Sequence, residues 1–446
     1  MSARPVRRAA ALLLFLGGLL LLGASPASAH VQIISSTPGD GSRLSAAPAQ
    51  VSVRLSENIG IQPNSLHVVD RQGVPADTGP VFQPGENAQE LAIRLRPGLP
   101  DGSYLIEYAF VSADSHPVRG TFAFVVGNGP LITSAGAVSA ATGTDGVVNA
   151  LFTTFRWVSF LAVALLGGLV FVQTCRPAGR TDPRARALLR IGCGLAAATA
   201  VAGFFLQGPY VAGKGLSALF DPSMIEATWR VAYGKLLVLR LVAAGTLAVL
   251  LPRLLVPADA LSQRLRFRYE NIALVSGLVV LLSFSATGHA ITDPILLLSI
   301  SADMAHFGAI AIWAGGLAQL ALCLRRPAPD EEVGPVVERF SRIAAIAVCV
   351  IVVSGTYLAF RYVPSVSALW TTTYGRLLLL KLAGFALLLA LANVSRQAMF
   401  RGITGRGRGV LTAELTRLRL AVGAEVALLA VVLGLAAMLS SISPAG

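Results

Sequence analysis

Residues 299–323 read SISADMAHFGAIAIWAGGLAQLALC, a run of 25 residues in which Asp303 is the only Asp, Glu, Lys or Arg. About 20 consecutive, mostly apolar residues in a helix are enough to cross the hydrocarbon core of a bilayer, so this run predicts a membrane-spanning helix. Seven further runs surround it. Together they predict eight spans, near residues 147–174, 188–211, 226–251, 270–289, 299–323, 338–360, 374–395 and 417–440.

The overall composition agrees with a membrane protein. Of the 446 residues, 54% are hydrophobic and 13% are charged. Soluble domains carry about 25% charged residues, so a wholly soluble protein is excluded. The net charge of +13 does not indicate nucleic-acid binding, because residues 30–128 hold six Arg, no Lys and nine acidic residues. The four cysteines exclude a disulfide-stapled scaffold.

Residues 1–29 have the features of a secretory signal peptide. Three arginines precede an apolar run of 15 residues, Ala9–Gly23, and the cleavage sequence Ala27-Ser28-Ala29 follows. The alternative is an uncleaved anchor helix, for which this run is short. Cleavage after Ala29 makes His30 the first residue of the mature chain, with a free α-amino group that can chelate a metal.

Residues 30–128 predict a small, exported all-β domain. Short alternating runs are separated by turn sequences such as Pro38-Gly39-Asp40-Gly41, a pattern typical of an antiparallel sandwich or barrel. We expect a flexible linker at 129–146, rich in Gly, Ser, Ala and Thr, and a helical membrane domain at 147–440. The expected strands are 31–35, 51–55, 66–69, 91–95, 104–111 and 121–126.

The arginines predict how the spans are oriented. They concentrate in the connections after the first, third, fifth and seventh spans, whereas the opposite connections hold little beyond Lys214 and Arg361. Positively charged connections stay in the cytoplasm. We therefore expect a multi-pass plasma-membrane protein whose β domain and C-terminus are extracytoplasmic.

The third and seventh spans share a motif that indicates an internal repeat. Spans four apart enter the membrane from the same side, so the motif predicts a parallel, tandem four-helix unit. Halves of this kind commonly build a pathway at their interface. Chance similarity of Leu-rich helices is the alternative. The matching positions are Trp229, Tyr233, Gly234, Lys235 and Arg240 in one half and Trp370, Tyr374, Gly375, Arg376 and Lys381 in the other.

Three residues of the exported domain form a candidate metal site. Asp114 and His116 are two residues apart, and residues i and i+2 of an extended strand share a face. With the amino group and the imidazole of His30, they supply three nitrogens and one oxygen. This donor set suits Cu(II) in tetragonal geometry. Zn²⁺ is the competing metal, although it more often takes thiolates or several imidazoles.

The motifs of the exported domain resemble the CopC copper-binding domain. The residues that carry this resemblance are Ala29-His30, Ser36-x-Pro38-x-Asp40-Gly41, Leu55-Ser56-Glu57, Gly102-x-Tyr104 and Val111-Ser112-Ala113-Asp114-x-His116-Pro117-x-x-Gly120-x-x-x-Phe124. The resemblance implies a Greek-key, Ig-like β-sandwich with one Cu(II) site, a histidine brace of His30, Asp114 and His116. Some members of this family have a second, Met-rich Cu(I) site, but no methionine lies between residues 2 and 223.

The membrane domain resembles CopD, so that the whole mature chain looks like a CopC–CopD fusion. The motifs are Gly288-His289-Ala290, His306-x6-Trp313-x-Gly315-Gly316-Leu317, Arg339-Phe340-Ser341, Ser354-Gly355 and Tyr374-Gly375-Arg376-x4-Lys381. The resemblance implies a membrane partner associated with copper uptake or copper resistance.

The membrane domain contains further candidate residues. His289, Asp303 and His306 lie toward the outer face and form a candidate copper site, with Cu(I) as a candidate cargo; the alternative is a solvated mouth or a helix contact. Arg240 and Glu425 lie at similar depths, so we expect a structural ion pair between them. His67 is expected to be a surface residue, and the four cysteines are expected to pack between helices rather than relay copper.

Two function classes follow. The first is copper capture outside the membrane and copper transfer or import through the membrane domain, which contributes to copper homeostasis or resistance. The second is a membrane redox protein that uses the copper brace or haem, although His289 and His306 are the only histidines of the helical part. No nucleotide-binding motif appears, and we expect no catalytic residues. The expected partners are the lipid bilayer and copper ions.

Overall fold

The computed structural model describes residues 33–56, 59, 65–111, 117–130, 146–257, 260–327, 331–404 and 408–442. The side chains of residues 111, 117, 289, 292, 398–404 and 408–415 are outside this description. The chain divides into two compact units. One contains residues 29–153 with 201–237, and the other contains residues 154–200 with 238 onward.

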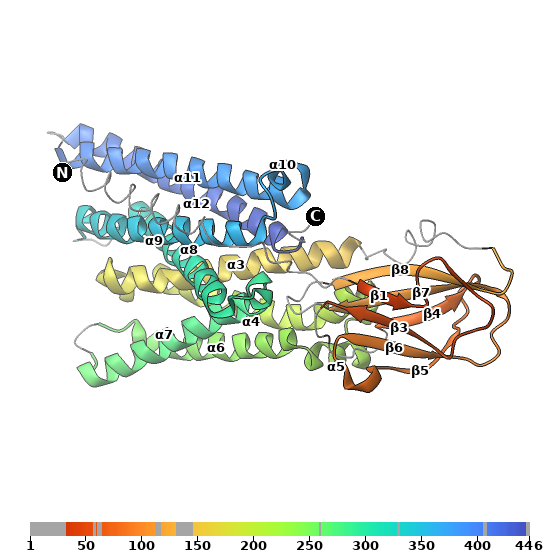
Figure 1. The fold of residues 1–446 in the computed structure, drawn as a ribbon. Coiled ribbons are helices and arrows are strands. Elements are labelled where there is room, and N and C mark those ends of the chain that lie inside the picture. The colour runs from red at the N-terminus through yellow and green to blue at the C-terminus, as the bar shows by residue number, and fades with distance from the viewer. Residues whose placement is uncertain are drawn as a thin grey trace. The chain divides into compact units, whose positions relative to one another are not determined.

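Eight strands form the predicted β-sandwich (Figure 1). One four-stranded sheet has the order β1-β3-β6-β5, and the other has the order β2-β8-β7-β4. All strand pairs are antiparallel except β2 with β8. The strands are β1 (Ile33–Thr37), β2 (Ser42–Leu44), β3 (Gln50–Leu55), β4 (Leu66–Asp70), β5 (Asp77–Phe82), β6 (Glu90–Leu95), β7 (Gly102–Val111) and β8 (Pro117–Val126).

The sandwich core follows from side-chain alternation. The buried side chains Leu66 and Val68 on β4 face the same way, since successive residues of a strand point to opposite faces. Tyr104 and Phe124 stack with their ring centroids 5.4 Å apart, and the Tyr104 hydroxyl donates to the carbonyl of Pro100 at 2.8 Å. An apolar core therefore joins the two sheets without a disulfide among the described residues.

Two strands were missed by the sequence prediction, and both are edge strands. β2 has only three residues and directly follows the turn at Gly41. β5 contains Gly79 and Pro80, which normally argue against a strand. Proline is tolerated at a sheet edge, where no neighbour requires its missing N–H group, and β5 has only β6 beside it.

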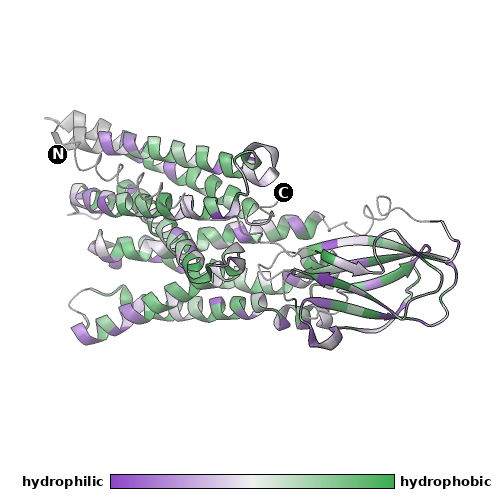
Figure 2. Cartoon of the chain, viewed as in Figure 1, coloured by the Kyte–Doolittle hydropathy of each residue, from purple (hydrophilic) through white to green (hydrophobic). Residues whose placement is uncertain are grey.

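Eight helices are long and apolar enough to cross a membrane among the described residues, as predicted. Apolar residues dominate these helices (Figure 2). The eight are α3 (Gly146–Thr174), α4 (Pro183–Ala212), α6 (Ala232–Leu254), α7 (Gln263–Ser285), α8 (Leu296–Arg325), α9 (Val333–Tyr362), α11 (Thr373–Thr404) and α12 (Arg408–Leu439).

The third predicted span began too early, because two helices meet where one was expected. α5 (Pro222–Arg230) ends before α6, and the residue between them, Val231, is extended. A Cβ on Gly234 would collide with the backbone of Thr228, so glycine is needed where α5 approaches α6. Gly375 approaches Ala368 of α10 (Ala368–Thr371) in the same way. The shared Tyr-Gly motif therefore has the same packing role in both places.

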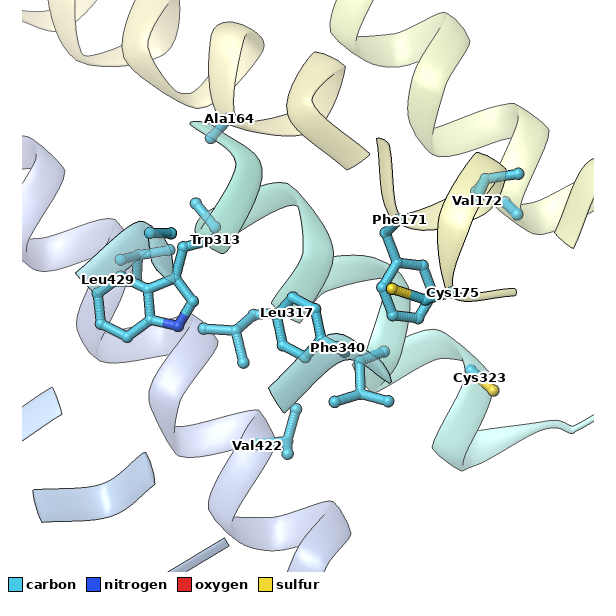
Figure 3. Close-up of a cluster of buried hydrophobic side chains, with 14 of the residues drawn as sticks. Ala164, Phe171, Val172, Cys175, Trp313, Leu317, Cys323, Phe340, Val422 and Leu429 are labelled. Atoms are coloured by element: carbon cyan, nitrogen blue, oxygen red, sulfur yellow. The ribbon is translucent and has the colours of Figure 1, made fainter. Parts of the chain in front are cut away.

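Glycines also allow α3 and α8, the first helices of the two predicted repeats, to cross closely. A Cβ on Gly167 would collide with the backbone at Ala311, and one on Gly315 with the backbone at Ala164. Beside this crossing lies the large apolar core of the helices (Figure 3). There the rings of Phe171 and Phe340 meet edge to face at 5.5 Å.

Candidate functional site

The three predicted ligands of the exported copper site, His30, Asp114 and His116, lie outside the described residues. The expectation that Asp114 and His116 share a strand face also concerns residues outside this description. The structure does describe the strands on either side. β7 and β8 pair without a break from Gly102↔Val126 to Val111↔Pro117, and Asp114 and His116 belong to the five residues that connect these two strands.

The strand register shows which strand ends are next to the predicted ligands in the chain. β1 begins at Ile33, three residues after His30, and Ile33 pairs with Leu55 at the end of β3. The same end holds the start of β6, which pairs antiparallel with β3. β6 runs away from this end, residues 96–101 connect it to β7, and β7 returns. The start of β1 and the connection between β7 and β8 are therefore at the same end of the sandwich.

An arginine close to this connection contacts a helix of the same compact unit. Arg119 on β8 donates from Nε to the carbonyl of Val211 at 2.6 Å and from Nη2 to the carbonyl of Tyr210. Both carbonyls belong to the last turn of α4, which has no following turn to satisfy them. Burial lowers the pKa of Arg119 from its ordinary value. Sequence reasoning missed this residue, because a lone arginine on a strand carries no signal.

His67 has a structural partner. Its Nδ1 lies 3.5 Å from Oδ2 of Asp77, and its side chain is 39% exposed. The other oxygen of Asp77 accepts from the backbone N–H of Val68 at 2.9 Å. Asp77 stands ten residues away on β5, a strand that the sequence prediction missed. These contacts agree with a surface role for His67.

In the helical part, the structure describes the surroundings of His306. Its Nδ1 lies 3.1 Å from the hydroxyl of Ser354 on α9. Asp303 stands one turn earlier on α8, and Lys381 of α11 is near enough to influence both Asp303 and His306 electrostatically. The short helix His289–Thr292 contains His289, whose side chain is not described.

No described group of three or more His, Cys, Asp or Glu side chains could hold a metal ion. Within the described part of the chain, Asp303 and His306 therefore do not form a complete ligand set. Cys175, Cys193 and Cys323 are buried, which agrees with the expectation that the cysteines pack between helices. Burial raises the pKa of Cys175, which favours its neutral form.

The structure shows other partners for Arg240 and Glu425, and no ion pair between these two side chains appears among the contacts of the described residues. Arg240 on α6 donates to the hydroxyl and the carbonyl of Ser283 at 2.8 and 3.0 Å and lies over the ring of Phe284. Glu425 on α12 accepts from the hydroxyl of Ser395 on α11. Counting residues from a helix end predicts depth but not the direction in which a side chain points.

A buried ion pair that the sequence did not reveal holds the connection before α8. Nε and Nη2 of Arg361 donate to the two carboxylate oxygens of Asp293 at 2.7 and 3.0 Å. The side chains are 4% and 0% exposed. Burial raises the pKa of Asp293, but its hydrogen bonds with Arg361 and with the backbone of Ile295 outweigh this and leave the pKa lowered. The pair joins residues 68 positions apart.

A second buried network lies at the other ends of the helices. Arg176, only 1% exposed, donates two hydrogen bonds of 2.8 Å to Glu331 and one of 2.7 Å to Asp182. Burial raises the pKa of Asp182, but hydrogen bonds, first of all the one from Arg176, outweigh this and leave it lowered. The network joins the end of α3 to the segments before α4 and α9. The arginine distribution from which we predicted the topology does not indicate that Arg176 is buried whereas the neighbouring arginines are exposed or half-buried.

Comparison with known proteins covers almost the whole described chain. Residues 33–127 match the CopC domain, residues 147–296 the N-terminal domain of copper resistance protein D-like proteins, and residues 334–439 copper resistance protein D. The copper transport protein CutJ of Bacillus subtilis is 30% identical over 374 residues, which are 82% of this chain and 67% of CutJ.

Two further relatives match one part each. Copper resistance protein C of Escherichia coli is 31% identical over 116 residues, 25% of this chain and 91% of that protein. Copper resistance protein D of Pseudomonas syringae pv. tomato is 35% identical over 202 residues, 42% of this chain and 64% of that protein. The predicted resemblance is thus confirmed in both parts. This chain belongs to the family of copper resistance proteins in which a CopC domain and a CopD membrane domain are fused.

Proposed function

We propose that this protein captures Cu(II) outside the membrane with its CopC domain and passes copper to or through its CopD domain. The proposed ligands are the amino group and imidazole of His30, Asp114 and His116. The relatives named for copper resistance and copper transport support the choice of metal.

One observation carries the proposed copper site. The strand order and register bring the start of β1 and the connection between β7 and β8 to the same end of the sandwich. His30 lies three residues before the start of β1 and His116 directly precedes β8, so the chain can bring both to one metal ion. Three nitrogens and one carboxylate oxygen form a donor set that suits Cu(II).

The role of the membrane domain and its orientation complete the proposal. The signal-like residues 1–29 and the arginine distribution support an orientation in which the CopC domain and the C-terminus are outside the cytoplasm. The protein binds and moves copper, without catalytic residues of its own, and so contributes to copper homeostasis or resistance. His306 is the only histidine within the eight membrane helices, so a pair of axial histidines for haem is not available there.

A substitution of His116 tests the site. The full-length chain with His116→Ala, purified in detergent, should lose most of its high-affinity Cu(II) binding in a titration followed by electron paramagnetic resonance. The matched control is His67→Ala on β4 of the same sandwich, which should titrate like the wild type because His67 contacts Asp77. A His116→Ala protein that titrates like the wild type would show that the site lies elsewhere.

A further inference from the structure

His306 of α8 lies against two consecutive residues of α9, and both restrict its ring. Nδ1 is 3.1 Å from Oγ of Ser354. A Cβ on Gly355 would stand only 2.9 Å from Cε1 of the ring, closer than real Cβ contacts. The absence of a side chain at Gly355 therefore leaves the space that the imidazole of His306 fills, and the hydroxyl of Ser354 contacts one nitrogen of that imidazole.

The hydrogen bonds of Ser354 determine which nitrogen of His306 carries the proton. A serine hydroxyl has one hydrogen to donate and two lone pairs to accept with. Oγ of Ser354 donates to the carbonyl of Val350 at 2.5 Å, one turn earlier on α9. With that hydrogen in use, Oγ faces His306 as an acceptor, so Nδ1 of His306 must be the donor. In a neutral imidazole Nε2 then has no hydrogen and a lone pair available for a metal.

An acidic and a basic side chain both lie in the surroundings of His306. Lys381 alone would repel a cation, and the acidic side chain of Asp303, one turn before His306 on α8, is within its electrostatic reach. The corresponding basic residue of the first repeat, Arg240, is instead bound to Ser283 and lies over Phe284. The second repeat thus brings an acidic side chain near its basic residue, beside a histidine whose Nδ1 contacts Ser354.

From this geometry we propose that Ser354 and Gly355 hold His306 as the Nδ1–H tautomer, so that Nε2 binds copper that reaches the membrane domain already as Cu(I), after a reductant outside this protein has supplied the one electron that converts Cu(II). Ser354 is then a positioning residue for a transport station in the membrane domain. The inference rests on the proposed function, because it takes copper as the cargo.

Nitrogen NMR of the full-length chain in lipid bilayers tests the tautomer directly. Ala305–His306 is one of two Ala–His bonds in the sequence, the other being Ala29–His30 at the predicted cleavage point. Labelling with 13C-alanine and 15N-histidine therefore identifies His306 without a substitution. We expect a protonated Nδ1 and a pyridine-type Nε2, and we expect added Cu(I) to shift the Nε2 resonance. A protonated Nε2, or an Nε2 resonance unchanged by Cu(I), would overturn the proposal.

Variants separate positioning from packing. Ser354→Ala removes the acceptor, so both tautomers should appear and the response to Cu(I) should weaken. Ser354→Thr keeps a hydroxyl and should restore the wild-type spectrum. Loss of a partner that orients a metal-binding histidine typically lowers affinity or activity 10- to 100-fold, and we expect copper uptake into proteoliposomes to fall by about this factor in Ser354→Ala. A wild-type spectrum and wild-type uptake in Ser354→Ala would refute the role of Ser354.

The role of Gly355 has its own matched control. Gly355→Ala should displace the ring of His306 and lower the response to Cu(I), whereas Gly277→Ala on α7, where a Cβ meets nothing within 4 Å, should not. Equal effects of the two variants would contradict the role of Gly355. Electron paramagnetic resonance of Cu(II) on each protein reports the exported site separately. An unchanged Cu(II) spectrum with a failed His306 test would refute this inference alone, whereas absence of Cu(II) binding in the wild type would refute the proposed function.

Discussion

The buried ion pair between Asp293 and Arg361 should be a large contribution to the stability of the membrane domain. We predict that Asp293→Asn destabilises the protein strongly. Both side chains are almost fully buried and share two short hydrogen bonds. The substitution keeps the size of the side chain but removes the charge that compensates the guanidinium.

The magnitude follows from the geometry. Removal of one partner from a buried ion pair costs about 3–5 kcal/mol, because a charge stays in a place of low polarity without its counter-charge. Asparagine can still accept one hydrogen bond from Arg361, so we expect about 3 kcal/mol for Asp293→Asn. Asp293→Ala should lie nearer 5 kcal/mol, because it also removes the acceptor for the backbone N–H of Ile295 at 2.7 Å.

The ion pair also predicts a dependence on pH. The pKa of Asp293 is lowered in the folded protein, so its ionised form contributes stability that is complete at neutral pH. This contribution is lost as the pH falls below the ordinary value of about 3.9 and through the lowered pKa. The stability difference between the wild type and Asp293→Asn should therefore shrink only in strong acid.

The assay is reversible unfolding in mixed detergent micelles, followed by circular dichroism. The matched control is Glu338→Gln on α9, which removes the exposed pair with Arg342, whose side chains are 60% and 73% exposed. Exposed pairs of this spacing contribute about 0.3–0.5 kcal/mol. If Asp293→Asn cost no more than Glu338→Gln, the buried pair would not be the stabilising element described above.

Two further predictions concern other contacts between helices. Overpacking typically costs about 1–3 kcal/mol, and Gly315→Ala should destabilise the protein by more than this because its Cβ would collide with the backbone at Ala164. Gly245→Ala should be tolerated, because a Cβ there meets nothing within 4 Å. Equal unfolding midpoints of the two variants would contradict the close helix crossing. Glu331→Gln should lower the free energy of unfolding by about 1–3 kcal/mol in the same assay, because Arg176 loses the charge of one partner. The loss is limited because Arg176 keeps its hydrogen bond to Asp182. An unchanged free energy of unfolding would show that the network does not stabilise the fold.

The features that were predicted from sequence depend on local patterns. Long apolar runs predict membrane helices, and alternating residues between turns predict strands, because burial repeats with the period of the element. Prediction failed where local composition and context disagree. β5 was missed because its Pro80 is acceptable in a strand mainly at a sheet edge, and being at an edge is a tertiary property.

The side-chain contacts of the helical part depend on how helices rotate against each other. Depth along the membrane placed Arg240 beside Glu425, but the structure directs Arg240 toward Ser283 of the next helix. Asp293 and Arg361 are 68 residues apart and carry no local signal of their pairing. For His306, the sequence identified the residue, and only the packing of α8 against α9 revealed its contact with Ser354.

The central claim is that the amino-terminal nitrogen of His30 binds Cu(II) together with His116 and Asp114. The most direct measurement adds one residue before His30, keeps signal cleavage, and compares the extended and native proteins by electron paramagnetic resonance at matched Cu(II). The extension turns the α-amino group, whose ordinary pKa is about 8, into an amide that is not a comparable ligand. We predict a changed spectrum and much weaker binding, and loss of the proton release that accompanies binding by the native amine. Identical spectra and identical affinity would show that the amino terminus is not a ligand.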